Sequence, residues 1–224
     1  GFPDFAALVK TGQGTLVLGG DDLLIHGASL TIEEGTIELG PSGNGLISVD
    51  GLSILPSGTL DLFDNHLVVH AAPATRLAVL ANVTALLTTG AGALTWDGPG
   101  ISSSAAAQDA SLLTALGVML NDNGLGGAYH ATFGGQPAGP SDVLVKYTYY
   151  GDADLSGTVD GTDYALTDNG FNAELGGWFD GDDNYDGLID GTDYALLDNA
   201  FNTQGGPLAA SPPAGLPPAA ERPS

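Results

Sequence analysis

Cysteine is absent from the chain, and lysine and arginine together supply only four of its 224 residues. The absence of cysteine excludes disulfide bonds, zinc–thiolate sites and thiol catalysis. Set against 27 acidic residues, the four basic ones leave a formal net charge of −23. Nucleic acid is therefore excluded as a partner, because phosphate binding needs clustered Lys and Arg.

Long apolar runs are also lacking. The chain has no run of about 18 consecutive apolar residues, so we predict no insertion into a membrane within it. It starts without Met and inside a β-type pattern. We therefore expect the C-terminal part of a longer, extracellular or cell-surface bacterial protein.

Glycine, in contrast, is abundant at 35 residues, and it marks turns such as Glu34-Gly35 and Asp50-Gly51. The runs between these turns begin about 7 to 10 residues apart, a spacing too short for helical crossovers. We interpret residues 1–71 as the last turns of a parallel β-solenoid. The predicted strands are Thr15–Leu18, Leu23–His26, Ser29–Ile32, Thr36–Leu39, Gly45–Val49, Leu52–Leu55, Thr59–Leu62 and His66–His70.

One stretch of this region also has a family likeness. Residues 10–18 read KTGQGTLVL, and residues 35–39 read GTIEL. Over about residues 7–39 the chain resembles the autotransporter-associated β-strand repeat. The resemblance implies a long passenger-like solenoid upstream, and it brings no catalytic residues.

Residues 72–150 change in character. Apolar residues at helical spacing predict a helix that opens near Pro73 and stops at Gly90. A second helix is expected over about 107–116, and β-branched and aromatic residues predict a strand over 143–150. We interpret this segment as a small α/β cap on the solenoid.

The end of the chain holds a proline-rich segment. Residues 205–224 contain six of the 13 prolines, together with Ala, Gly and Ser, which predicts a disordered tail. The expected domains are therefore a solenoid end over 1–71, a cap over 72–150, a third domain over 151–204 and this tail.

The third domain contains an internal duplication. Residues 152–172 read DADLSGTVDGTDYALTDNGFN, residues 182–202 read DDNYDGLIDGTDYALLDNAFN, and thirteen of the 21 aligned positions are identical. Each repeat fits a 12-residue calcium loop, in which oxygen ligands come from positions 1, 3, 5, 7, 9 and 12 and a glycine at position 6 permits the turn. Two calcium ions are predicted. Their ligands are Asp152, Asp154, Ser156, Thr158 (carbonyl), Asp160 and Asp163 in loop 1 (residues 152–163), and Asp182, Asn184, Asp186, Leu188 (carbonyl), Asp190 and Asp193 in loop 2 (residues 182–193).

Charge repulsion gives these loops a reason to bind a metal. Each gathers four carboxylates, and two such charges about 5 Å apart repel by roughly 3 kcal/mol at an effective dielectric near 20. Calcium takes six to eight hard oxygen ligands and turns this repulsion into ligation. We further expect Thr162 and Thr192 to cap the following helices, Val159 and Ile189 to pair as a short strand, and Trp178 to fill the gap between the repeats.

Both loops end in Asp instead of the Glu of the usual EF-hand, and each is followed by a single helix. In this the region resembles a type I dockerin, which keeps the loop and the exiting helix and lacks the entering helix. The resemblance implies docking to a cohesin-like protein. Gly161-Thr162 and Gly191-Thr192 stand where dockerins contact partners, and their identity fits a two-fold symmetric surface.

These observations give one functional hypothesis and one alternative. The fold expected is mixed: a β-solenoid (parallel β-helix-like) part with a small α/β cap, followed by an all-α pair of calcium loop–helix repeats. The function expected is calcium-dependent attachment of a secreted, surface-associated protein to a cohesin-like or other surface protein. The alternative is that the repeats dock a polysaccharide-degrading enzyme whose catalytic domain lies upstream. No catalytic residue is assigned within this chain, which we do not expect to be an enzyme.

Overall fold

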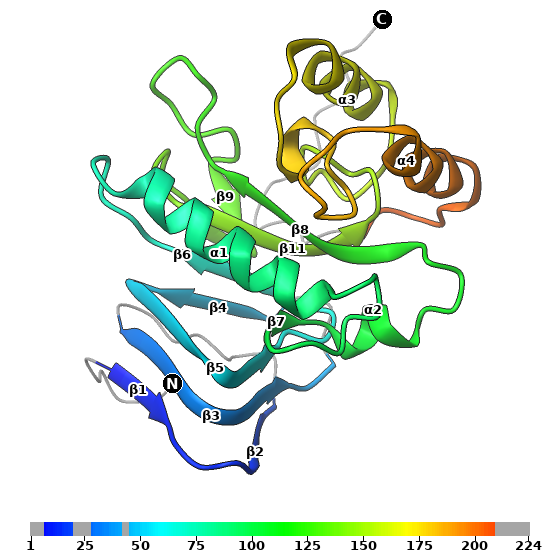
Figure 1. Cartoon of the computed structure of the whole chain (residues 1–224). Helices are drawn as coiled ribbons and strands as arrows, with labels where there is room; N and C mark the ends of the chain where they lie inside the picture. Colours follow the sequence, from blue (N-terminus) through cyan, green and yellow to red (C-terminus); the bar gives the residue numbers. More distant parts are fainter. Residues whose placement is uncertain (1–6, 20–27, 42–44, 209–224) are drawn as a thin grey trace, which may run out of the picture.

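The structure, a computed structural model, describes residues 7–19, 28–41 and 45–208 of the chain. Figure 1 shows how its helices and strands are arranged. The strands are β1 (Ala7–Lys10), β2 (Thr15–Leu18), β3 (Ser29–Leu39), β4 (Leu46–Val49), β5 (Gly51–Asp61), β6 (His66–Val69), β7 (Gly100–Ser102), β8 (Thr114–Leu120), β9 (Thr132–Phe133), β10 (Gln136–Pro137) and β11 (Val143–Tyr149). The helices are α1 (Arg76–Ala91), α2 (Ser104–Gln108), α3 (Gly161–Ala173), the 3₁₀ turn η1 (Trp178–Asp180) and α4 (Gly191–Thr203).

The first sheet is parallel, with strand order β1-β3-β5-β7 and β2 paired to β3. Strand β3 buries Leu30 and Ile32 in its first half and Ile37 and Leu39 in its second half. The buried residues have even numbers in the first half and odd numbers in the second half. Because side chains alternate between the two faces, a regular strand would point one of these pairs toward solvent. The β3–β5 register shifts after Ile32, and this irregularity keeps both pairs in the core.

The second sheet is mixed, with order β4-β6-β11-β8. Strands β4 and β6 are parallel, whereas β11 is antiparallel to both β6 and β8. Six of the seven residues of β8 are buried, as are six of the seven of β11. Strands with this pattern are covered on both faces, and in Figure 1 α3 and α4 lie on the opposite side of β8 and β11 from β1, β3 and β5.

Helix α1 packs closely on β7. A Cβ added at Gly90 would lie 1.8 Å from the Ile101 carbonyl oxygen, so only glycine permits this approach. The helix was expected to stop at Gly90, but it continues through Ala91 and is capped by Gly92. Within the described ranges, no helix is long and apolar enough to cross a lipid bilayer.

The C-terminal repeats share the core of the sheets. One cluster of buried apolar residues extends from Leu30 in β3 to Trp178, Tyr185 and Leu196 in the repeats. Trp178 lies so close to Gly117 of β8 that an added Cβ there would be 2.5 Å from the Trp178 Nε1 atom. The Tyr185 hydroxyl donates a hydrogen bond to the Leu116 carbonyl of β8. The repeats therefore pack as a layer of the fold on β8.

The expected fold class is wrong. The chain forms an α/β fold with one parallel and one mixed sheet, where we expected a β-solenoid with a cap and a separate all-α module. The parallel pairs β3–β5 and β4–β6 do occur, but β11 and β8 extend the second sheet in antiparallel sense. The repeats cannot form an all-α module of their own because Trp178, Tyr185 and Leu196 are buried in the common core.

Several local expectations also change. The helix predicted over 107–116 is instead the short α2 followed by strand β8, because Thr114–Leu120 pairs with β11. The predicted strands within 29–39 and within 52–62 join into the single long strands β3 and β5. The strand predicted over 143–150 is confirmed as β11.

Two expectations fall wholly or largely outside the described residues: the strand Leu23–His26 and the tail beyond residue 208. Just before that point the chain contacts the first repeat. The Gly205 amide donates to the Tyr149 hydroxyl over 3.1 Å, and the Leu208 amide donates to the Gly157 carbonyl over 2.9 Å. Residues 205–208 therefore contact the end of β11 and loop 1.

Candidate metal centre

The two predicted loops lie immediately before α3 and α4, and each helix starts in the same way. The Asp160 side chain accepts a hydrogen bond from the Thr162 amide, and the Asp163 side chain accepts one from the Asp160 amide. The same capping box recurs at Asp190 and Asp193. The helix caps are therefore the aspartates at loop position 9, and the prediction that Thr162 and Thr192 are the caps is wrong.

Loop 1 brings three predicted carboxylates together. Oxygen atoms of Asp152, Asp154 and Asp163 all lie within 4.8 Å of one another. Asp152 and Asp163 are completely buried and Asp154 is partly buried. Three carboxylate oxygens at this separation can ligate one cation, since calcium–oxygen distances are about 2.3–2.6 Å.

The other predicted ligands of loop 1 surround this triad. The Ser156 hydroxyl lies 3.3 Å from the Asp152 Oδ1 atom and donates to the Thr158 carbonyl over 3.1 Å. One oxygen of Asp160 accepts from the helix α3 amide of Thr162. The structure thus places Ser156 and the Thr158 carbonyl beside the triad, with Asp160 at the helix end.

Loop 2 follows the same path with an amide in place of one carboxylate. The Asp182 Oδ2 atom accepts from the Gly187 amide over 3.2 Å, as Asp152 accepts from Gly157 in loop 1. The Asp193 Oδ1 atom accepts from the amides of Asp183 and Asn184. Position 3 is Asn184 and position 5 is Asp186, where loop 1 has Asp154 and Ser156, so each set of predicted ligands has four carboxylates.

The remaining ligands of loop 2 form a small network. The Asn184 Nδ2 atom donates to the Asp186 carboxylate over 3.0 Å, and the Asn184 carbonyl oxygen accepts from the Asp186 amide. The Leu188 amide donates to Asp186, while the Leu188 side chain is 64% exposed. Asn184 and Asp186 therefore lie on the same side of the loop.

Loop 2 also contains buried oxygens that no protein group satisfies. The Asp182 Oδ1 atom and both carboxylate oxygens of Asp183 are buried without a hydrogen-bond partner in the described chain. Asp182 is 4% exposed and Asp183 is completely buried. A buried carboxylate oxygen without a partner is costly, and a bound cation removes that cost.

The protonation equilibria of these groups reflect the same crowding. Burial, together with the neighbouring carboxylates of Asp152 and Asp154, raises the pKa of Asp163 to about 7. Burial raises the pKa of Asp182 to about 6, together with the charge of Asp193. Burial also raises the pKa of Asp152 to about 6, although the Lys146 ammonium opposes this rise. Each carboxylate is disfavoured in its charged form, which a divalent cation would reverse.

The residues fit calcium. The candidate ligands are carboxylate, hydroxyl, amide and carbonyl oxygens, which are the hard donors that calcium prefers. The buried Asp182 oxygen without a partner and the crowded triad of loop 1 both supply negative charge that lacks compensation. No thiol or imidazole belongs to either set, which argues against zinc.

Four neighbours of the loops were not foreseen from the sequence. The Lys146 ammonium lies 3.9 Å from the Asp152 Oδ2 atom, and the Thr148 hydroxyl donates to the same oxygen. Asp183 is buried beside loop 2. The Gln204 side chain hydrogen-bonds both the amide and the carbonyl of Val159. Val159 therefore pairs with Gln204, and the expected Val159–Ile189 strand pairing is wrong.

Trp178 occupies the position expected of it, between the repeats. Its Nε1 atom donates to the Asp152 carbonyl over 2.8 Å, and its ring lies 5.5 Å from that of Tyr185. The ring is 1% exposed. Trp178 thus joins position 1 of loop 1 to position 4 of loop 2.

The exposed surface of α3 and α4 repeats the two-fold pattern of the loops. Tyr164 packs edge-on against Phe201 and donates to Asp198, while Tyr194 packs edge-on against Phe171 and donates to Asp168. Phe171 is 54% exposed and Phe201 is 47% exposed. We name these six residues the aromatic–acidic face.

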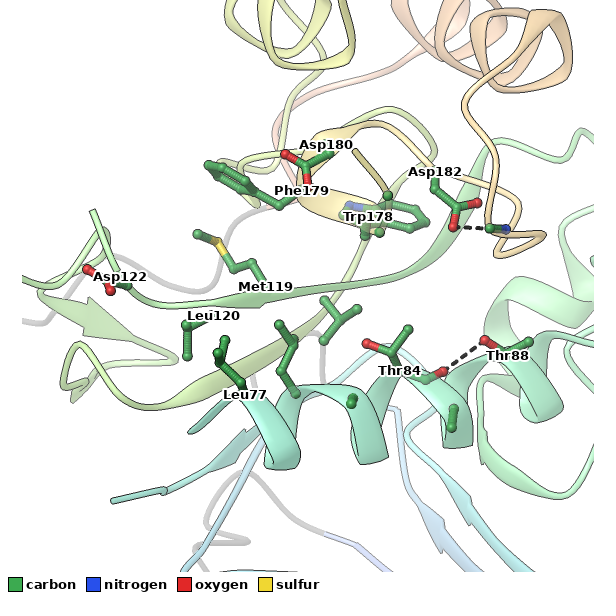
Figure 2. Close-up of a pocket in the computed structure, with 17 residues that line it drawn as sticks. Leu77, Thr84, Thr88, Met119, Leu120, Asp122, Trp178, Phe179, Asp180 and Asp182 are labelled. Atoms are coloured by element: carbon green, nitrogen blue, oxygen red, sulfur yellow. Dashed lines mark hydrogen bonds between the residues drawn. The ribbon is translucent and has the colours of Figure 1, made fainter. Parts of the chain in front are cut away.

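A groove of about 640 Å³ lies between α1, β8 and η1 (Figure 2). Leu77 of α1 contributes one apolar wall, and Met119 of β8 and Phe179 lie across from it. Asp180 and Asp182 line the same groove. Loop 2 therefore forms part of the wall of a mainly apolar groove.

Comparisons of the chain with protein-family models, with curated protein sequences and with solved structures find no match. The functional interpretation therefore depends on the geometry and chemistry of the loops.

Proposed function

We propose that the C-terminal repeats bind two calcium ions and serve as a calcium-dependent attachment module of a secreted surface protein. The observation that carries the proposal is the convergence of Asp152, Asp154 and Asp163 within 4.8 Å. The buried, unpartnered oxygen of Asp182 at the matching position of loop 2 supports a second site. The resemblance to type I dockerins favours the same ion and the same role.

Calcium would link ligation to folding. The loops are joined to helices α3 and α4 by Asp163 and Asp193, whose carboxylates also hold the capping boxes. A ligand that binds only the folded state adds about 2.7 kcal/mol per site at 100 times its dissociation constant. Two filled sites would therefore add about 5 kcal/mol to the free energy of unfolding.

The aromatic–acidic face is the surface that we assign to attachment. Exposed aromatic side chains are enriched where proteins bind partners. Asp168 and Asp198 add negative charge in symmetric positions, so the face fits a partner that presents basic and apolar residues. A cohesin-like or other surface protein with such a patch could bind in either of two opposite orientations.

Isothermal titration calorimetry tests the metal sites. Calcium added to the metal-free protein should fill two sites, and the double variant Asp152→Ala with Asp182→Ala should fill none. The same double substitution at the exposed Asp97 and the partly buried Asp122, both outside the loops, is the matched control and should retain both sites. Two calcium ions bound by the loop double variant would refute the ligand assignment.

A pull-down from an extracellular fraction, with calcium or with EGTA, tests attachment. Because either half of the aromatic–acidic face can be used, Phe171→Ala or Phe201→Ala alone should retain capture, and the two together should abolish it. Leu112→Ala, an exposed apolar residue outside the face, is the control. Capture that persists in EGTA, or in the Phe171→Ala with Phe201→Ala variant, would contradict the proposed attachment surface.

A further inference from the structure

The two loops have nearly the same sequence but lie in different surroundings. In loop 1 both oxygens of Asp152 have partners: Oδ1 accepts from the Ser156 amide, and Oδ2 accepts from the Gly157 amide and the Thr148 hydroxyl. In loop 2 the equivalent Asp182 has one amide partner and one buried oxygen without any. The position-1 carboxylate of loop 1 therefore has a hydrogen-bond partner for each oxygen, and that of loop 2 does not.

A lysine accounts for much of this difference. The Lys146 ammonium lies 3.9 Å from the Asp152 Oδ2 atom and donates to the Leu155 carbonyl of loop 1 over 2.8 Å. Both side chains are almost completely buried, at 3% and 0% exposure, so water screens their charges weakly. Of the basic side chains that the structure describes, Lys146 is the one that forms an ion pair with a loop carboxylate.

Further contacts hold loop 1 in position. The Trp178 Nε1 atom donates to the Asp152 carbonyl, and the His130 ring nitrogen Nε2 lies 2.7 Å from the Asp154 carbonyl. Loop 1 is thus joined by side chains to strand β11, to η1 and to the segment before β9. A loop held in this way pays less conformational entropy on binding, but its fixed positive charge repels an incoming cation.

Loop 2 has an additional acidic residue that loop 1 lacks. Asp183 stands at position 2, where loop 1 has Ala153. Its carboxyl group is completely buried, and neither of its oxygens has a hydrogen-bond partner. Loop 1 therefore has an added basic side chain and loop 2 an added buried acidic side chain, and both differences favour a cation at loop 2.

We infer that the two sites are inequivalent: loop 2 binds calcium first and more tightly, while Lys146 acts as a built-in cation that weakens calcium binding at loop 1. Attachment then responds to calcium in two steps. Loop 2 binds calcium at low calcium concentration. Loop 1 binds it at higher concentration, because the ion must compete with the Lys146 ammonium for the Asp152 carboxylate. This inference rests on the proposed calcium function and specifies how its two sites are regulated.

Single-loop variants separate the two sites in calorimetry with calcium alone. Asp154→Ala should leave loop 2 as the working site, and Asp186→Ala should leave loop 1. We expect the site that remains in Asp154→Ala to bind at least about tenfold more tightly than the site that remains in Asp186→Ala. Equal affinities, or the reverse order, would overturn the inference while leaving the calcium function intact.

Charge substitutions then test the cause. In the Asp186→Ala background, Lys146→Met should raise the calcium affinity of loop 1 about tenfold, and Lys146→Gln, which keeps a donor for the Leu155 carbonyl, should act in the same direction. In the Asp154→Ala background, Asp183→Ala should lower the affinity of loop 2 to a similar extent. Arg76→Met breaks an ion pair with Asp122 outside the loops and should change neither affinity.

A readout without calcium completes the test. In EGTA, Lys146→Gln should lower the unfolding temperature, because Asp152 loses its buried ammonium partner. Millimolar calcium should restore more of the lost unfolding temperature in this variant than in Arg76→Met. Unchanged loop 1 affinity in both Lys146 variants would refute the role of the lysine. If no variant and no wild-type protein binds calcium, the proposed function itself fails, which is a distinct result.

Discussion

At the residue scale, the candidate site is defined by buried carboxylates that have too few hydrogen-bond donors and positive charges around them. Asp163 and Asp182 have neighbours of the same charge, and the Asp182 Oδ1 atom has no hydrogen-bond partner. The sequence repeat was sufficient to predict which side chains converge, because position in a 12-residue loop determines direction. It could not predict Lys146 or Asp183 as neighbours, since both depend on how the loops pack against the sheet.

The raised pKa values predict how calcium binding depends on pH. Protons compete with calcium at Asp163, with a pKa of about 7, and at Asp152 and Asp182, with pKa values of about 6. We expect calcium affinity to fall about tenfold or more between pH 7.5 and pH 5.5. Calorimetry at these two pH values measures it, and an affinity independent of pH would contradict the assigned ligands.

In the metal-free protein, the free energy of unfolding should fall as pH rises. A carboxyl whose pKa is raised by folding holds more protons in the folded state than in the unfolded state, here between its ordinary value of 3.8 and about 7. In EGTA the contribution of these groups to the free energy of unfolding is therefore present at low pH and is lost as pH rises through that window. Urea unfolding at pH 5 and pH 7.5 measures this. From pH 5 to pH 7.5 the free energy of unfolding should fall in EGTA and rise in calcium.

At the element scale, turn residues and alternation predicted most strand positions, and helical spacing predicted α1. The pairing of strands was not predictable, because the helix expected over 107–116 overlaps the start of β8 and the strand itself was not predicted. Both helix caps were expected two residues late, since Thr162 and Asp160 are both good capping residues. Their geometry decides between them: Asp160 accepts the hydrogen bond from the Thr162 amide.

The approach of α1 to β7 provides a test of the element packing. Gly90→Ala places a Cβ 1.8 Å from the Ile101 carbonyl oxygen, so the helix and the strand must separate. We expect a loss of about 2–4 kcal/mol in the free energy of unfolding, measured by urea denaturation in calcium. Gly161→Ala, at a helical glycine with open space around it, is the control and should change stability by less than about 0.5 kcal/mol. Equal effects of the two substitutions would contradict the close packing.

At the scale of the whole molecule, the repeats and the sheets share one core. The duplication suggested an independent module because it is short and self-similar, but Trp178 and Tyr185 are buried against β8. Sequence periodicity describes which face of an element is apolar and does not say which element covers it. That is why the convergence of Asp152, Asp154 and Asp163 was predictable and the α/β architecture was not.

A shared core predicts a single cooperative transition. Heating should remove the far-ultraviolet signal of the sheets and the near-ultraviolet signal of Trp96 and Trp178 at the same temperature, because both tryptophans belong to one buried cluster. Circular dichroism at both wavelengths measures this. Two separate transitions, of which just one shifts with calcium, would show that the repeats unfold independently of the sheets.

The central claim is that each loop needs a divalent cation to balance its buried carboxylates. Differential scanning calorimetry of the protein over a series of free calcium concentrations tests it most directly. The unfolding temperature should rise steadily with the logarithm of calcium concentration, with a slope that corresponds to two ions released on unfolding. An unfolding temperature that is the same in excess EGTA and in millimolar calcium would contradict the claim.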